Sequence, residues 1–319
     1  MSTVATEAEL TAERRSPAPR LPAPRKRPRQ RNWLTIWALM LPAIIALIAL
    51  IAVPVYKMVV LSFEKPNIFT HKYKNVGWAN YKSVLGDHEF WTVVFKSVIF
   101  DVAAAAATVI CGVAVATAMM HMNKALKLAV STGLLLVWAT PQFIGATVWQ
   151  WFFDTEFGVA NWLALHLGFT KEFQHSWYTS QWTAFFVVFL VVVWQSVPFV
   201  ALAIYGALLT VPEELHEAAQ MDGAGPVTLF RRVTLPLIVP VLIISTLLSV
   251  IWDFRVLTQI AFTTQGAPYG QTNLLGPYIY QKAISSGAYG VASAIGVVVT
   301  VMLMGLSYFY VKIMRREDQ

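Results

Sequence analysis

Six long apolar runs dominate this 319-residue chain and constrain its fold more than any other feature. A helix needs about 20 apolar residues to cross a bilayer, and each run reaches that length. Only 13% of the residues are charged, against about 25% in an average soluble domain. The pattern predicts an all-α, polytopic membrane protein with six transmembrane helices in a domain over residues 33–312. The runs cover residues 33–63, 91–120, 126–152, 182–209, 236–262 and 288–311.

Positive charge gathers at the N-terminus. Five of the seven net positive charges fall within the first 31 residues, which are also rich in Pro and Ala. This composition predicts a disordered tail over residues 1–32, expected to lie on anionic membrane lipid rather than to bind nucleic acid. A basic flank beside the first span is typical of the cytoplasmic side.

Six spans would return the chain to that side, where residues 313–319 form a short C-terminal tail with Arg315 and Arg316. We therefore expect a multi-pass protein of the cytoplasmic (inner) membrane with both termini in the cytoplasm. Lysines in the first outer loop argue against this orientation, but the flank of the first span usually decides it. These lysines are Lys65, Lys72, Lys74 and Lys82.

A polar stretch over about residues 211–235 separates the fourth and fifth runs. Thr210 could cap a helix that has Pro212 in its first turn. Asp222-Gly223 then supplies a stop, because glycine accepts the left-handed conformation that ends helices. Gly225-Pro226 restarts a short helix, and Leu235-Pro236 opens the next run. The stretch predicts a cytoplasmic helical hairpin, the alternative being an ordinary connection between two spans.

The hairpin resembles the EAA loop of permease subunits of ABC importers. Glu217-Ala218-Ala219, then three residues to Gly223, then Leu235-Pro236 carry the resemblance. In that family the loop is a coupling helix that docks on a cytoplasmic ATPase. The resemblance implies ATPase-coupling roles for Glu217, Ala218, Ala219, Asp222, Gly223, Ala224 and Phe230.

Other segments are similar to the sugar-importer branch of the same family, namely the maltose-type first permease. Gly77 with Asn80-Tyr81 precedes the second run, and Gly158 with Asn161 follows the third. After the fifth run come Thr272, Tyr278-Ile279-Tyr280 and residues 290–294, GVASA, whereas Gly266-Ala267-Pro268 departs from the family's Gly-Gly-Pro. The resemblance covers roughly residues 35 to 315. It implies import of a di- or oligosaccharide or a sugar-like polyol, with four kinds of partner. These are a second, homologous permease subunit, two ATP-binding subunits, an extracytoplasmic sugar-binding protein and membrane lipid.

The chain carries no residue pattern for catalysis. It has no Gly-x-x-x-x-Gly-Lys-Ser/Thr loop for phosphates, and its six histidines show no metal-ligand spacing. We therefore expect no enzyme and no bound cofactor or metal, with ATP and magnesium held by the partner ATPase subunits. Two other classes stay open: an ABC permease for a non-sugar solute, and a secondary carrier, which would need an internal repeat that is not evident.

Polar groups inside the apolar runs are the candidates for a solute site, because such groups are costly at membrane depth. Trp252 and Asp253 offer a flat ring for a sugar face and a carboxylate for its hydroxyls. Alignment with the maltose-type family implies seven pocket-lining positions, which are Gln195, Ser196, Phe199, Ser249, Trp252, Asp253 and Val256.

Each polar candidate also has a structural explanation. Asp253 could form an ion pair with Arg255 or Lys96, and Gln195, Ser196 and Ser249 could hydrogen-bond between helices. We expect Asp101 to pair with Lys96 in a purely structural role. Five tryptophans are expected in an outer aromatic belt: Trp149, Trp151, Trp162, Trp177 and Trp182.

Overall fold

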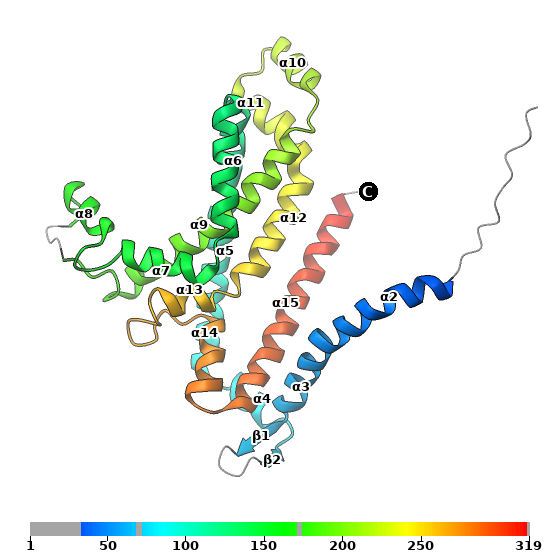
Figure 1. Cartoon of the computed structure of the whole chain (residues 1–319), viewed down its shortest axis with the longest axis vertical. Coiled ribbons are helices and arrows are strands. Elements are labelled where there is room, and N and C mark those ends of the chain that lie inside the picture. The colour runs from blue at the N-terminus through cyan, green and yellow to red at the C-terminus, as the bar shows by residue number, and fades with distance from the viewer. Residues whose placement is uncertain (1–32, 68–71, 171–173, 318–319) are drawn as a thin grey trace, which may run out of the picture. The chain divides into compact units, whose positions relative to one another are not determined.

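The computed structural model describes residues 33–67, 72–170 and 174–317. The chain divides into two compact units, Met1–Pro54 and Val55–Gln319, and the elements of each are considered separately (Figure 1). The predicted disordered tail, residues 1–32, lies outside the described residues. Helices dominate, as the apolar runs predict.

The first apolar run is helical but not uniformly α-helical. It consists of α2 (Trp33–Leu47), the π-helical turn η1 (Ile48–Ala52) and α3 (Val53–Ser62). The N–H of Val53 bonds to the carbonyl of Ile48, five residues back. This wide turn stands directly before Pro54, whose missing N–H cannot join the regular ladder.

Four further helices have the length and apolarity of membrane spans and agree with the second, fourth, fifth and sixth runs in position. They are α5 (His88–Met120), α9 (Gln181–Leu208), α12 (Leu235–Asp253), with its preceding turns, and α15 (Tyr289–Glu317). Asp87 and Ser180 cap α5 and α9 by accepting backbone N–H bonds. Ala116, Val200 and Ile238 are buried where α5, α9 and α12 pack together. These three helices therefore form the core that positions everything else.

The third run, expected as one span, is broken into two helices. It forms α6 (Lys124–Ala139) and α7 (Gln142–Phe152), which are bent by 103° at Thr140-Pro141. Proline disfavours helical backbone at the residue before it, and Thr140 is extended with ψ 126°. Among the described residues, five helices can cross a membrane, or six if this bent pair is one span.

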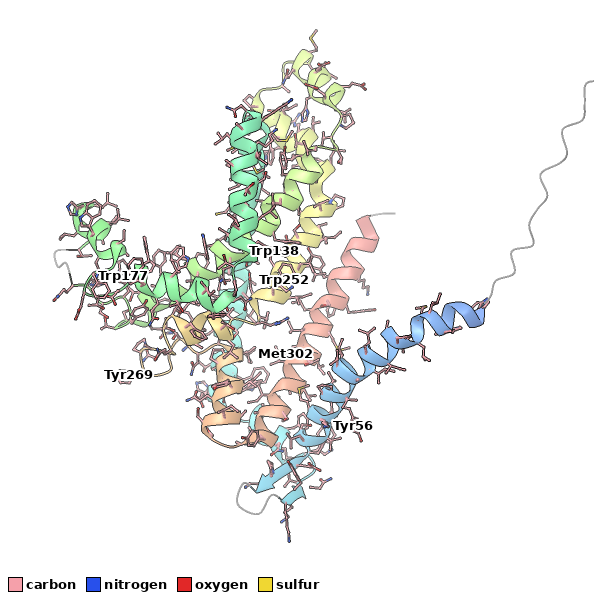
Figure 2. All side chains as sticks on the ribbon, viewed as in Figure 1. Tyr56, Trp138, Trp177, Trp252, Tyr269 and Met302 are labelled. Carbon is pink, nitrogen blue, oxygen red and sulfur yellow. The ribbon has the colours of Figure 1, made fainter. Side chains whose placement is uncertain are left out.

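The fifth run also ends earlier than expected. Helix α12 stops at Asp253, and a turn over residues 254–256 leads into α13 (Leu257–Phe262). A loop then leads to α14 (Leu275–Tyr280) and the π-turn η3 (Gln281–Ser285). Hydrogen bonds from Thr272 to Ala267 O, at 2.8 Å, and between the Thr264 and Thr272 hydroxyls hold the loop. Tyr269 projects from it, fully exposed (Figure 2).

The two segments with Asn80 and Asn161 that resemble the sugar-importer branch form short helices, α4 (Ala79–Leu85) and α8 (Val159–His166). Their asparagines are buried hydrogen-bond hubs. Asn80 Nδ2 donates to Ser62 O and Glu64 O, and Asn161 Nδ2 donates to three backbone carbonyls. A small β-hairpin that the sequence did not predict precedes α4, with β1 (Glu64–Asn67) antiparallel to β2 (Lys72–Asn75).

The five tryptophans fall into two groups. Trp151, Trp162 and Trp182 are exposed, as a belt requires. Trp149 and Trp177 instead pack, partly buried, around Phe153. Trp177 also donates to Asn161 Oδ1 at 2.5 Å. These two rings stabilise the segment between α7 and α9.

Gly290, near the start of α15, sits against the backbone beside the β-hairpin. A Cβ at this position would lie 2.0 Å from Glu64 O and 2.8 Å from Asn80 Nδ2. At Gly305 of the same helix a Cβ would meet nothing within 4 Å. Close packing of α15 against β1 and Asn80 therefore requires a glycine at position 290.

We predict that Gly290→Ala lowers the free energy of unfolding by about 1–3 kcal/mol, the usual cost of overpacking. Gly305→Ala is the matched control and should leave stability unchanged or raise it by up to ~1 kcal/mol through helix propensity. Thermal unfolding midpoints of the two purified variants measure the difference. Equal midpoints would contradict the contact.

Candidate functional site

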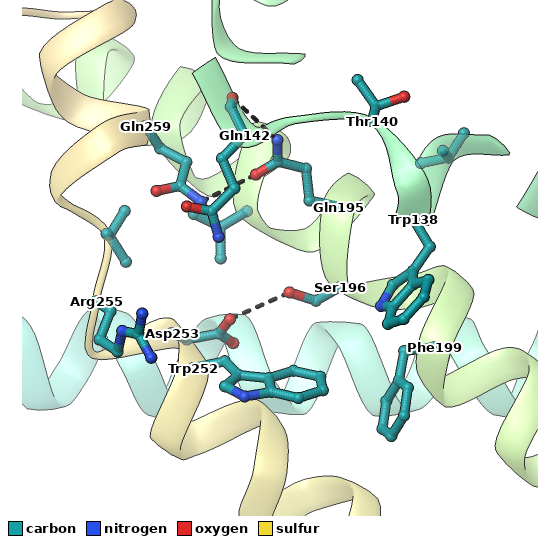
Figure 3. Close-up of a pocket in the computed structure, with 13 residues that line it drawn as sticks. Trp138, Thr140, Gln142, Gln195, Ser196, Phe199, Trp252, Asp253, Arg255 and Gln259 are labelled. Atoms are coloured by element: carbon teal, nitrogen blue, oxygen red, sulfur yellow. Dashed lines mark hydrogen bonds between the residues drawn. The ribbon is translucent and has the colours of Figure 1, made fainter. Parts of the chain in front are cut away.

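A cavity of about 330 Å³ opens where the α6–α7 bend meets α9 and the end of α12 (Figure 3). Its walls come from the break between α6 and α7, the middle of α9, and the end of α12 with the turn after it. Its lining residues are Val137, Trp138, Thr140, Gln142, Val192, Gln195, Ser196, Phe199, Trp252, Asp253, Arg255, Val256 and Gln259.

Six of the seven positions expected to line a pocket meet in this cavity. The exception is Ser249, which lies one turn before Asp253 on α12 and is only 1% exposed. Its Oγ has no hydrogen-bond partner within the described part of the chain. Ser249 is therefore packed between helices and does not reach the cavity.

Two sets of hydrogen bonds fix the polar side chains of the cavity. Ser196 Oγ donates to Asp253 Oδ1 at 3.1 Å, and Gln259 Nε2 donates to Gln195 Oε1 at 2.9 Å. Gln195 Nε2 in turn reaches the Gln142 carbonyl, at 3.2 Å. Asp253 Oδ2 has no partner among the described residues. The site thus keeps one carboxylate oxygen able to accept a hydrogen bond.

Aromatic rings form the opposite side. The Phe199 and Trp252 rings lie edge to face, with centroids 4.9 Å apart and planes at 67°. Trp252 is 40% exposed and Trp138 is 54% exposed. A wall of partly exposed rings facing planar polar groups is the usual composition of a small-molecule site.

The ion pairs considered for Asp253 are not formed. Across the described residues, the salt bridge present is Lys282–Glu89, at 3.1 Å. Lys96 donates instead to the backbone carbonyl of Gln271 at 3.3 Å, and Arg255 lines the cavity with an exposed side chain. The other structural explanation was hydrogen bonding between helices. Gln195 and Ser196 do form such bonds.

The expected pair of Asp101 with Lys96 is wrong as well. Five residues of α-helix turn the chain by about 140° beyond a full turn, so the two side chains leave α5 in different directions. Asp101 is 2% exposed, and its Oδ1 has no partner among the described residues.

The hairpin between α9 and α12 stands at one end of the bundle (Figure 1). It consists of α10 (Glu213–Met221), α11 (Pro226–Leu229) and the π-turn η2 (Phe230–Thr234). Gly223 has φ +79° and ends α10, with Ala224 N bonded to Ala219 O. The stop at Gly223 and the restart at Pro226 are confirmed. The cap is not: Pro212 occupies the cap position, and Thr210 Oγ1 donates back to Ala207 O.

The coupling candidates mostly face outward. Glu217, Ala218, Asp222 and Gly223 are exposed, while Ala219, Ala224 and Phe230 are half-buried. His216 Nε2 lies 3.0 Å from Thr234 Oγ1 and ties α10 to η2. Three apolar side chains are uncovered on this hairpin: Leu215, Met221 and Val227, the second of them 88% exposed.

Residues 108–316 match the family model described as binding-protein-dependent transport system inner membrane component. The chain belongs to that family. The match, which contains α9, the hairpin and α12, confirms the resemblance to ABC importer permeases and the assignment as a transport subunit rather than an enzyme. The permease is an inner membrane component with several apolar helices.

Similar proteins extend over nearly the whole permease. The diacetylchitobiose uptake system permease protein DasB of Streptomyces coelicolor is 36% identical over 90% of this chain and 88% of its own length. The trehalose/maltose transport system permease protein MalF of Thermococcus litoralis is 30% identical, covering 88% and 94%. A crystal structure of a bacterial alginate ABC transporter matches with a TM-score of 0.76 at 19% identity, covering 91% and 96%, which supports the fold.

The sequence did not single out part of the cavity wall. Trp138 and Thr140 were missed because the third run was read as one straight span, although Pro141 was the visible sign of a break. Gln142 and Gln259 stood out only as polar residues in apolar runs. Arg255 was considered only as an ion-pair partner, and here its guanidinium faces the cavity instead.

We predict that Asp253→Ala and Arg255→Ala act independently on stability, because the structure holds no ion pair between them. The thermal midpoints of the two single variants and the double variant should give a coupling energy below about 0.5 kcal/mol. If the double variant recovered the stability lost in Asp253→Ala, the two charges would be paired and Asp253 Oδ2 would not be without a partner.

Proposed function

We propose that this permease imports a di- or oligosaccharide, or a sugar-like polyol, through the cavity beside Asp253. The observation that carries the proposal is that exposed rings, Trp252 and Trp138, line the same cavity as Asp253, whose buried Oδ2 has no hydrogen-bond partner among the described residues. Sugar rings present C–H faces that pack on aromatic rings and hydroxyls that donate to carboxylates. Relatives named for diacetylchitobiose, trehalose/maltose and sulfoquinovosyl glycerol support a sugar over another solute.

Within this proposal Asp253 accepts hydrogen bonds from solute hydroxyls, while Trp252 packs on a sugar face. Gln195 and Ser196 hold the polar wall in place through their bonds to Gln259 and Asp253. Phe199 and Val256 supply apolar wall. Ser249 is left out of the solute contacts, because it does not line the cavity.

The proposed assembly contains a second, homologous permease subunit, two ATP-binding subunits and an extracytoplasmic sugar-binding protein. The family description, binding-protein-dependent transport, supports the last of these. The exposed hairpin with Met221 and Val227 is the proposed docking face for an ATP-binding subunit, which holds ATP and magnesium. Both termini are then cytoplasmic, since the hairpin faces the ATPase.

The solute can be named by a binding screen. The cognate binding protein, purified alone, should be stabilised against heat by one or a few di- or oligosaccharides in a panel that also contains amino acids and peptides. Stabilisation by a non-sugar solute alone would overturn the proposed substrate class.

We predict that Asp253→Ala lowers sugar uptake roughly ten- to a hundredfold, because a hydrogen bond to a charged group contributes about 1.5–3 kcal/mol. Ser249→Ala, one turn away and outside the cavity, is the matched control and should transport normally. Uptake of labelled sugar, normalised to assembled complex, measures both. Equal uptake by the two variants would remove Asp253 from the site.

We also predict that Gly223→Val uncouples transport from ATP hydrolysis. A β-branched residue resists a φ of +79°, at a cost of about 1–2 kcal/mol or more, so the hairpin would change shape. Gly225 has φ −71° and open space around it, so Gly225→Val should be tolerated. ATPase stimulation by the loaded binding protein measures coupling, and normal stimulation in Gly223→Val would make the hairpin a passive connector.

A further inference from the structure

The β-hairpin between α3 and α4 carries its positive charge on one face. In its register Lys65 lies directly opposite Lys74. Residues directly opposite in an antiparallel pair share a face, and so do residues two apart on a strand. Lys72 therefore joins Lys65 and Lys74 on that face. All three side chains are exposed.

This arrangement is unfavourable for the hairpin by itself. Like charges directly opposite each other destabilise an antiparallel pair. No acidic side chain forms a salt bridge with any of the three lysines within the described residues. Glu64 is on the other face, opposite Asn75. An anionic surface lying against the three lysines relieves this repulsion.

The hairpin is held firmly at its base. Val76 N donates to Phe63 O at 2.8 Å, and Asn80 Nδ2 donates to Ser62 O and Glu64 O at 2.8 and 3.0 Å. The rings of Phe63, Trp78 and Tyr81 pack together with centroids 5.1–5.2 Å apart. The lysine face is therefore presented in a fixed place and not on a mobile loop.

That place is the end of a membrane span. Candidate span Trp37–Ser62 stops two residues before β1 begins at Glu64. Tyr73 and Trp78 beside it are each 64% exposed, and Tyr and Trp are enriched where a membrane protein meets the lipid headgroups. A strand of four residues spans about 13 Å, so the lysines lie close to the end of the span.

We propose that the face formed by Lys65, Lys72 and Lys74 binds the phosphate headgroups of anionic phospholipids. Charge, exposed interfacial aromatic rings and the position next to the end of a span all fit this partner. Each lysine near such a surface contributes about a fivefold preference for anionic over neutral lipid. The proposal is independent of the transported solute.

A spin label tests the contact directly. Cys111→Ala removes the native thiol, and Asn67→Cys carries the nitroxide on the lysine face, directly opposite Lys72. The permease, assembled with its partner subunits, is reconstituted in vesicles of phosphatidylcholine alone or mixed with phosphatidylglycerol. Collision of the label with oxygen, which dissolves in lipid, should rise with phosphatidylglycerol, and collision with a water-soluble nickel chelate should fall. Salt at about 1 M, where charges are screened within ~3 Å, should reverse both changes without any substitution.

Lys65→Gln/Lys74→Gln should abolish the response to phosphatidylglycerol. Lys124→Gln/Lys312→Gln removes two exposed lysines from other helices and is the matched control, in which the response should persist. Equal collision rates in the two kinds of vesicle would overturn the proposal. A response to phosphatidylglycerol that persists in Lys65→Gln/Lys74→Gln would overturn it too. A label that changes only when the binding protein is added would show that the face docks a protein instead.

Discussion

The absence of water in the bilayer core governs this structure, because every backbone N–H and C=O at that depth needs a partner within the protein. Continuous helices meet this demand, and the chain departs from them in two apolar runs, at Thr140-Pro141 and over residues 254–256. Both departures border the same cavity, which Thr140, Arg255 and Val256 help to line. Irregular backbone is tolerated at membrane depth where it faces a cavity. The breaks in the helices thus create the candidate site.

The sequence predicted the features that depend on length and on single residues. Apolar run length placed the spans, and Gly223 was expected at its left-handed turn. The resemblance to the family predicted the cavity residues in α9 and at the end of α12. Features that depend on contacts between distant segments could not be predicted. The sequence after Asp253 contains no Pro or Gly that would mark the end of α12. The position of α13 depends on its packing against α7 and α9, which the sequence does not reveal. The burial of Asn80 and Asn161 also needed the folded chain, because each bonds to backbone from another element.

A single helix joins the two functional regions. Helix α12 follows directly from η2 in the hairpin and ends at Asp253 in the cavity. Its 19 residues correspond to a rod of about 28 Å. Thr234 at the hairpin end is bonded to His216, and Asp253 at the other end is bonded to Ser196 of α9. Helix α12 and the turn before it are therefore bonded to a neighbouring element at both ends, one in the hairpin and one in the cavity.

The contact of Gly290 with the Glu64 carbonyl has a mechanical consequence. Backbone lies on backbone there, so no side chain can rotate to let the two segments slide apart. Asn80 fastens the same spot by bonding to that carbonyl. Farther along α15, Tyr310 Oη donates to the Ile243 carbonyl of α12, so the helix is bonded to its neighbours near both ends. The junction of α15, α4 and the β-hairpin is therefore a tight seam that holds these three elements together as one unit.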